Sequence, residues 1–430
     1  MGSYIPSTEQ QRKEMLEKAG FSSFDELYAD VPAEVKLAKE LHLPSGKSEL
    51  EVSRFMRALA EDNKVYRSVF RGAGAYSHYI PAIVKSVVSK EEFVTAYTPY
   101  QAEISQGVLQ SIFEYQTMIC ELTGMDVSNA SVYDGAVAAA EATVMCRNPK
   151  NNTIYISKAV HPDTMKVVKT YAWANGREVV EIPLKDGKTD ARFLEGKSGA
   201  CVLIAQPNYY GLIEDAREIG EITHNANMKY ILAVEPFAAC VLPSAREYGA
   251  DIAVGEGQPL GMPVSYGGPY LGFMAATDKM MRQLPGRIVG ETTDHDGRKA
   301  YVLTLQAREQ HIRREKASSN ICSNEALCAM TASVYLSAMG PKGMKEAASQ
   351  CYAKAHYLAD ELEKAGYPRK YAGDFFMEFV TECEDPKALL EKLDRKGILG
   401  GEIVDKGILW CATELNTKEE MDELVREVQK

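Results

Sequence analysis

Short apolar runs alternate with amphipathic segments from residue 130 onward, and this alternation constrains the fold more than any other feature of the chain. The runs have the length of β-strands and cover residues 152–157, 178–182, 200–206, 230–234 and 251–254. Helical patterns over 162–174 and 215–227 lie between them. Strands separated by helices form crossover units, and such units build parallel sheets. The sequence therefore predicts an α/β fold with a mostly parallel sheet.

The two ends of the chain have a different texture. Near the N-terminus helical patterns prevail, and Ser48 with Glu51 has the spacing of a capping box. After Gly297 the pattern shifts to helices, then to short strand candidates and a last helix; these segments cover 324–339, 344–365, 375–381, 407–412 and Thr417 onward. A chain of 430 residues exceeds what one compact core usually holds. We expect an N-terminal helical extension over 1–70, a large α/β domain over 71–300 and a small α+β C-terminal domain over 301–430.

The composition narrows the class of protein. The net charge of −11 and the pI near 5.4 disfavour nucleic acid and anionic membranes as obligatory partners, because both need concentrated Lys and Arg. The 9 cysteines are scattered and form no C-x-x-C pair, which is typical of reduced thiols. No run of about 18 apolar residues occurs, and the first residues lack the pattern of a signal peptide. We expect a cytoplasmic protein with no membrane span.

Several familiar binding motifs fail on spacing. Gly72-x-Gly74 and Gly255-x-Gly257 lack the third glycine of a dinucleotide-binding loop, and no nucleotide-triphosphate loop occurs. The histidines show no pairing with a nearby acid at ligand spacing, so a metal site is disfavoured.

Residues that follow the predicted strands form a candidate cofactor pocket, because an open parallel sheet binds ligands at the carboxyl ends of its strands. Asp134-Gly135-Ala136 opens a helix of small residues whose N-terminus could hold a phosphate. His161 could stack on a pyridine ring, Asn208 could bond its phenolic oxygen, and Glu235 could pair with its nitrogen. Together these features favour a pyridoxal-phosphate pocket.

Each of these residues also has an ordinary structural interpretation. Asp134 is among the best N-cap residues, and as a phosphate ligand it would place a carboxylate beside a dianion. His161 precedes Pro162 and could simply start a helix. Glu235 could cap its strand, and its extra methylene relative to Asp would push the acid too far into the pocket. We therefore expect a pocket that keeps the shape of a cofactor site without its function.

No lysine occurs between Lys229 and Lys279, where the pattern predicts the lysine that would bind the cofactor. The candidate position holds Gln258. A carboxamide nitrogen cannot attack an aldehyde, so it cannot form a Schiff base. We predict no catalytic residue in this chain and no covalently bound cofactor on it.

Two loops carry hydrogen-bonding aromatics and a cation, a composition typical of interfaces and binding mouths. The residues we single out in these loops are Arg71, Tyr76, His78, Tyr79, Tyr97, Tyr100 and Gln101. Two ordinary loops with partly buried tyrosines remain an alternative. A third segment, 308–322, is rich in cations. A solvated helical face is the default for such charge, and a docking surface or an anion contact from Arg313 or Arg314 is the alternative.

Three motifs carry a resemblance to a known family. They are Tyr97-Thr-Pro-Tyr-Gln-Ala-Glu-Ile-Ser-Gln-Gly107, Gly255-Glu-Gly-Gln-Pro-Leu-Gly261 with Tyr266-Gly-Gly-Pro269, and Glu309-Gln-His-Ile-Arg-Arg-Glu-Lys-Ala-Ser-Ser-Asn-Ile-Cys322. The sequence closely resembles the glycine decarboxylase P-protein of the glycine cleavage system, from about Tyr4 to its end. The family occurs as one long chain or as two subunits, and this chain resembles subunit 1, the alpha chain that is equivalent to the N-terminal half.

The resemblance implies a pyridoxal-phosphate enzyme of fold type I, with the aspartate-aminotransferase architecture, assembled as an α2β2 heterotetramer. It implies that the beta subunit carries the cofactor lysine and that the alpha subunit keeps a vestigial pocket. By motif position, Tyr97, Tyr100 and Gln101 are the best candidates for residues lent to the partner's active site. His78 and Arg71 are further candidates for this role.

The implied activity is that of an oxidoreductase, glycine dehydrogenase (aminomethyl-transferring). Glycine loses CO2, and its aminomethyl group passes to the lipoamide of the H-protein. We expect the chain to be inactive without the beta subunit. Two rival hypotheses stay open: a self-sufficient pyridoxal-phosphate enzyme that uses a displaced lysine such as Lys279, and a non-catalytic structural or regulatory subunit.

Overall fold

The computed structural model describes residues 6–37, 39, 41–94, 96, 98–148, 151–306, 310–317, 319–321 and 324–429. Tyr97 and Cys322 lie outside the described residues. The chain divides into two compact units, Met1–Lys64 and Val65–Lys430. No described helix is both long enough and apolar enough to cross a lipid bilayer. The predicted domain boundaries at 70 and 300 stay predictions.

The first unit is helical, as predicted. It contains α1 (Glu9–Lys18), α2 (Phe24–Leu27), the 3-10 turn η1 (Ala33–Val35) and α3 (Glu49–Glu61). Thr8 caps α1, and Ser48 caps α3 in the predicted capping box with Glu51. Each cap satisfies backbone N–H groups that have no acceptor within the helix.

A seven-stranded sheet forms the centre of the second unit, in the order β2-β10-β9-β8-β7-β3-β4. Its strands are β2 (Val127–Ser128), β3 (Ile154–Ser157), β4 (Val179–Ile182), β7 (Cys201–Gln206), β8 (Lys229–Val234), β9 (Ile252–Glu256) and β10 (Gly272–Ala276). The five strands from β9 to β4 are parallel, and β10 runs antiparallel to β9 and β2. The predicted mostly parallel sheet is confirmed.

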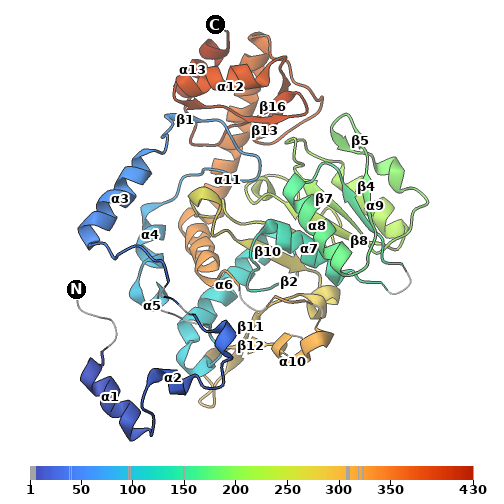
Figure 1. Cartoon of the computed structure of the whole chain (residues 1–430). Helices are drawn as coiled ribbons and strands as arrows, with labels where there is room; N and C mark the ends of the chain where they lie inside the picture. Colours follow the sequence, from blue (N-terminus) through green and yellow to red (C-terminus); the bar gives the residue numbers. More distant parts are fainter. Residues whose placement is uncertain are drawn as a thin grey trace. The chain divides into compact units, whose positions relative to one another are not determined.

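Helices cover both faces of this sheet (Figure 1). Helices α7 (Gly135–Met145) and α8 (Pro162–Ala174) pack on one face, against side chains such as Ile156 and Leu203. Helices α6 (Gln106–Thr123), α9 (Ala216–Asn225) and the first half of α11 (Ala326–Lys364) pack on the other, against side chains such as Val202 and Ile204. Successive residues of a strand point to opposite faces, so one buried strand contributes to both cores.

The C-terminal part has its own small core. Strands β13 (Glu378–Glu382), β16 (Gly407–Cys411) and β15 (Glu402–Val404) form an antiparallel sheet, packed by α12 (Pro386–Arg395) and α13 (Lys418–Gln429). The pair β1 (Ser68–Val69) and β14 (Ile398–Leu399) adds a parallel contact. Helix α11, orange in Figure 1, runs from the large sheet to this core and is interrupted at Gly340, which has φ 62° and precedes Pro341. The two helices predicted on either side of this position are confirmed.

One region was predicted wrongly. The helical pattern expected after Gly297 instead begins with a strand, because β11 (Ile288–Thr293) and β12 (Lys299–Thr304) form an antiparallel hairpin. The hairpin packs on α6 through Val289 and Tyr301. Few of its other side chains are buried, so the two-residue apolar period of a strand is barely visible in its sequence.

The remaining elements are short and connect the larger ones. They are α4 (Ala82–Val88), α5 (Glu91–Val94), η2 (Ala102–Ile104), β5 (Leu184–Lys185), β6 (Lys188–Thr189), η3 (Ala191–Leu194), η4 (Ala238–Cys240), η5 (Ser265–Gly267), η6 (Asp278–Gln283), α10 (Gln310–Arg313) and η8 (Arg314–Lys316).

Candidate functional site

A cavity of about 260 Å³ lies at the carboxyl ends of the parallel strands. Ala205, Val234 and Gly255 place it at the ends of β7, β8 and β9. Five of the residues that the sequence singled out for a cofactor pocket line it, namely Asp134, Gly135, Ala136, His161 and Glu235. We call it the acidic cavity, because Asp134, Glu235, Glu256 and Asp163 all line it and no described lysine or arginine does.

Two carboxylates of the chain itself occupy the N-terminus of α7, which the sequence indicates as a possible phosphate site. Asp134 is the N-cap, and its Oδ1 accepts from the Val137 N–H at 2.7 Å. Glu256 Oε2 accepts from the Gly135 N–H at 2.9 Å. Burial raises the pKa of Glu256, and the charge of Asp134 raises it further. The helix end that could bind an external anion is therefore already filled.

His161 is held by both of its ring nitrogens. Its Nδ1 accepts from the Asp163 N–H at 3.1 Å, so Nε2 carries the proton and donates to the Ala73 carbonyl at 2.9 Å. A Cβ on Gly74 would lie 2.9 Å from the imidazole, so this glycine backbone rests directly on the ring. His161 is the N-cap of α8, in agreement with the interpretation as a helix start.

Glu235 also bonds within its own segment. Its carboxylate accepts from the Phe237 N–H at 3.1 Å and from the Ala238 N–H at 2.6 Å. Burial raises the pKa of this carboxyl, against the opposing effect of His78. These bonds fix the turn that follows β8, as the alternative interpretation of a strand cap predicts.

Asn208 and Gln258 do not line the acidic cavity. Asn208 is buried, donating to Glu214 Oε1 at 2.8 Å and accepting from the N–H groups of Tyr210 and Leu212. Gln258 follows β9, as predicted, and its side chain is fully buried. Its amide accepts from the Tyr76 N–H at 2.9 Å and donates to the Tyr76 and Met262 carbonyls at 2.9 and 2.7 Å. The side chains of Asn208 and Gln258 therefore stabilise loops of the chain through hydrogen bonds.

The residues of the acidic cavity do not fit pyridoxal phosphate. Binding that cofactor needs an amine for its aldehyde and donors for its phosphate. The described lining residues provide no amine, and they place carboxylates where the phosphate would sit. Lys279 cannot substitute for this amine, because it follows the end of β10. That end, Ala276, pairs with Ile252 at the amino end of β9, whereas the acidic cavity lies at the carboxyl end.

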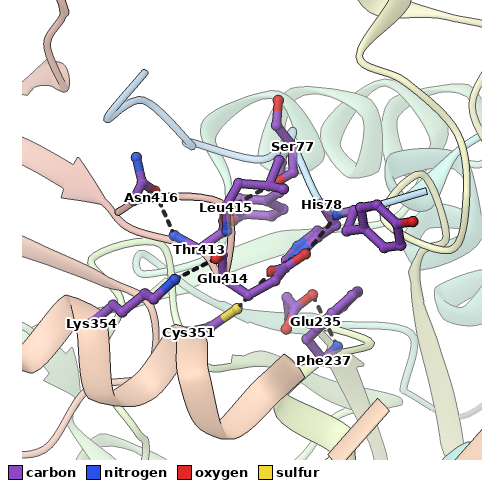
Figure 2. Close-up of polar contacts among 12 residues, drawn as sticks. Ser77, His78, Glu235, Phe237, Cys351, Lys354, Thr413, Glu414, Leu415 and Asn416 are labelled. Carbon is purple, nitrogen blue, oxygen red and sulfur yellow. Dashed lines mark hydrogen bonds and ion pairs between the residues drawn. The ribbon is translucent and has the colours of Figure 1, made fainter. Parts of the chain in front are cut away.

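His78 is part of a buried polar cluster (Figure 2). Its side chain is 1% exposed, its Nδ1 donates to Glu414 Oε2 at 2.8 Å, and its ring stacks on Phe237 with centroids 3.7 Å apart. Cys351 Sγ donates to the same carboxylate at 3.2 Å. Ligand atoms of His78, Cys351 and Glu414 lie within 4.8 Å of one another, from three segments that no sequence spacing connects. Hydrogen bonds link the three side chains, and His78 Nε2 has no hydrogen-bond partner among the described residues.

The other loop candidates lie in different surroundings. Arg71 bonds the C-terminal part, donating to the Gly400 and Gly401 carbonyls and pairing with Glu402 at 3.5 Å. Tyr100 is 54% exposed, and its hydroxyl accepts from Arg287 Nη2 at 3.0 Å. Gln101 is exposed. The structure thus brings Tyr100 and Gln101 to the surface of this chain and directs His78 inward.

The cationic segment is described only in part, over 310–317 and 319–321. Arg314 lines a cavity of about 440 Å³ together with Glu141. Burial raises the pKa of Glu141 to about 7, opposed by hydrogen bonds from Ser319 and Tyr171. The predicted docking or anion contact at Arg313 or Arg314 stays a prediction.

The sequence did not single out Glu256 or Arg287. Glu256 could have been recognised as an acid at the end of a buried strand. The sequence predicts that this strand ends at residue 254, whereas β9 extends to Glu256. No local pattern identifies Arg287, which precedes β11 and is 2% exposed.

Comparisons with known proteins show the family of the chain. The family described as "Glycine cleavage system P-protein" matches residues 2–428. A protein of Moorella thermoacetica named "Probable glycine dehydrogenase (decarboxylating) subunit 1" is 50% identical over 98% of each chain. Proteins of that name from Geobacillus kaustophilus and Bacillus subtilis are 49% and 47% identical, over 99% of this chain and 98% of theirs.

Solved structures show the same relationship. A crystal structure of glycine decarboxylase (P-protein) of the glycine cleavage system, in inhibitor-bound form, has a TM-score of 0.93 and 39% identity, covering 100% of this chain and 99% of that one. An aspartate aminotransferase from Thermus thermophilus has a TM-score of 0.60 at 13% identity, over 84% of this chain and 98% of that one. The second likeness is one of fold alone, and it confirms the predicted aspartate-aminotransferase architecture. The chain belongs to the glycine cleavage system P-protein family.

Proposed function

We propose that the chain is the alpha subunit, or subunit 1, of glycine decarboxylase. Relatives with the name of that subunit match it along nearly its whole length. The observation that carries the proposal is the acidic cavity, which keeps the position of a cofactor site and fills it with Asp134 and Glu256. A chain with such a cavity needs a companion that holds the cofactor.

The companion in this proposal is the beta subunit, in an α2β2 assembly in the cytoplasm. It holds pyridoxal phosphate on its own lysine, and this cofactor supplies an electron sink for the loss of CO2 from glycine. The aminomethyl group then passes to the lipoamide of the H-protein. The bacterial sources of the relatives support the cytoplasmic assignment.

The alpha chain contributes a wall to the partner's active site, through Tyr97, Tyr100 and Gln101. The exposure of Tyr100 and Gln101 supports this role. A wall that excludes water destabilises the glycine carboxylate relative to neutral CO2 and so favours decarboxylation. We assign His78 and Arg71 an indirect part, because both bind within the chain and position the loop between them.

Reconstitution tests the proposal. The purified chain mixed with pyridoxal phosphate is expected to give no visible absorbance band of an internal aldimine, because Gln258 offers no amine. Exchange of labelled CO2 into the carboxyl group of glycine is expected only after the beta chain is added. Exchange by this chain alone would contradict the proposal.

A further inference from the structure

A second cavity, of about 290 Å³, lies beside Tyr100 and has the opposite character to the acidic cavity. The end of α5, the described residues Ala96, Thr98 and Pro99, α6 and the start of α11 form its walls. Arg287 and Asn324 contribute its charged and amide groups. None of its described lining residues is acidic. We call it the arginine cavity.

Arg287 is buried, and the described residues provide no counter-ion for it. The residue is 2% exposed, and its guanidinium donates to Asn324 Oδ1 at 3.2 Å and to the Tyr100 hydroxyl at 3.0 Å, both of which are neutral. Its Nε has no hydrogen-bond partner, and no carboxylate among the described residues forms an ion pair with it. A buried charge that lacks a partner is strongly unfavourable, so such groups usually meet an anion.

The N-terminus of α11 adds positive potential at the same place. Ala326 and Leu327, in its first turn, line the cavity, and their N–H groups have no acceptor within the helix. The N-cap residue, Glu325, makes no side-chain bond to them and does not line the cavity. The positive end of a helix dipole favours an anion, as an arginine does.

Another buried arginine, Arg177, lies beside the opposite end of a helix, although its Nη2, like Nε of Arg287, has no hydrogen-bond partner among the described residues. Arg177 donates from Nη1 to the Thr143 carbonyl, in the last turn of α7, and from Nε to the Asn152 carbonyl at 3.1 Å. The C-terminal end of a helix is its negative end, so the charge of Arg177 is matched. Arg287 instead lies beside a helix start, where two positive sources converge.

We propose that the arginine cavity binds a carboxylate, held by the Arg287 guanidinium and the first turn of α11. An arginine fork matches the two oxygens of a carboxylate, and Nη1 and Nη2 each keep a second N–H beyond their bonds to Asn324 and Tyr100. The identity of the occupant rests on the proposed function: it is either the carboxylate of glycine bound at the partner's site or an acidic side chain of the partner subunit.

Acetate tests the site in the full chain alone. Melting temperatures are compared in acetate and in chloride at equal ionic strength, and acetate is expected to raise the melting temperature of the wild-type chain by several degrees. Arg282→Gln, which removes an exposed arginine elsewhere, should keep this gain. Arg287→Gln should lose it. Equal melting temperatures in the two salts, or an undiminished gain in Arg287→Gln, would overturn the proposal.

A second variant keeps the test decisive if Arg287→Gln does not fold. Leu327 is 43% exposed, lines the cavity and lies in the first turn of α11, where an acidic residue is favourable. Leu327→Glu should tether a carboxylate beside Arg287, raise the melting temperature in chloride and abolish the acetate gain. Leu327→Gln, of the same size and uncharged, should keep the gain. Equal behaviour of these two variants would count against the site.

The reconstituted complex distinguishes the two sources of carboxylate. With Leu327→Glu, a glycine KM raised more than tenfold at unchanged affinity for the beta chain identifies the substrate carboxylate. Affinity for the beta chain lowered more than tenfold at an unchanged KM identifies a side chain of the partner. If both the glycine KM and the affinity for the beta chain stay unchanged, the proposal is overturned. A wild-type complex without exchange activity would instead contradict the proposed function and leave the acetate result standing.

Discussion

The two cavities use the same local device, a helix N-terminus, in opposite ways. In the acidic cavity Asp134 and Glu256 accept the first-turn N–H groups of α7. In the arginine cavity the start of α11 meets a buried guanidinium that has no counter-charge among the residues the structure describes. The chain has therefore closed one anion site with its own carboxylates and left another one open. A subunit that depends on a companion for its chemistry needs an open anion site that faces the companion, and it does not need a cofactor phosphate site of its own.

The largest effect is expected from pH near the acidic cavity. Glu378 accepts from the Ala73 N–H and from the hydroxyl of Tyr76, which lines the cavity, and burial raises the pKa of Glu378 to about 7. A raised folded-state pKa means that the contribution to stability is full below the unfolded value near 4.5 and is lost as pH rises through about 7. The loss should reach about 3 kcal/mol.

Glu378→Gln isolates this contribution. Glutamine can keep the bond from the Ala73 N–H, and the Tyr76 hydroxyl can accept from its amide. Urea unfolding of both proteins between pH 5 and 8 should show a falling stability in the wild type and a flatter profile in the variant. Parallel profiles would show that Glu378 does not titrate in this range.

The second largest effect is expected on stability, from the close packing of Gly135 against Glu256 at the acidic cavity. A Cβ on Gly135 would lie 2.9 Å from the Glu256 backbone nitrogen, and a backbone atom cannot move away easily. Gly135→Ala should therefore destabilise the chain by about 2 kcal/mol, measured by urea unfolding. Gly107, in the first turn of α6, has no atom within 4 Å of such a Cβ. Gly107→Ala should be neutral or stabilising by about 0.5 kcal/mol, and equal losses at both positions would refute the contact argument.

The smallest effect tests the wall beside the arginine cavity. Tyr100→Phe removes the hydroxyl that accepts from Arg287, and exchange activity of the reconstituted complex should fall about tenfold with assembly intact. Tyr352→Phe, which removes a phenol bonded to Asp374, serves as the matched control. Unchanged exchange in Tyr100→Phe would favour a purely structural subunit.

The fold was predictable because its signals are local. Runs such as 200–206 and 230–234 are apolar on both faces, which is typical of buried parallel strands. The capping box at Ser48 needs only a few neighbouring residues. The hairpin at 288–304 was missed because most of its side chains stay outside the core.

The candidate site was predictable in outline only. The order of Asp134, His161 and Glu235 along the strands placed the acidic cavity, and the absence of an amine at Gln258 was visible. The partners of these side chains were not visible, because Gln258 bonds Tyr76 and Glu256 bonds Gly135, each more than a hundred residues away in sequence. A lone arginine such as Arg287 gives no sign in the sequence of its missing counter-ion.

The central claim is that the reactive cofactor is held by the companion and not by this chain. Borohydride reduction of the reconstituted, active complex, followed by peptide mapping, tests it directly. We expect pyridoxyl label on one lysine of the beta chain and none on this chain. Stoichiometric label on any lysine of this chain, Lys279 included, would contradict it.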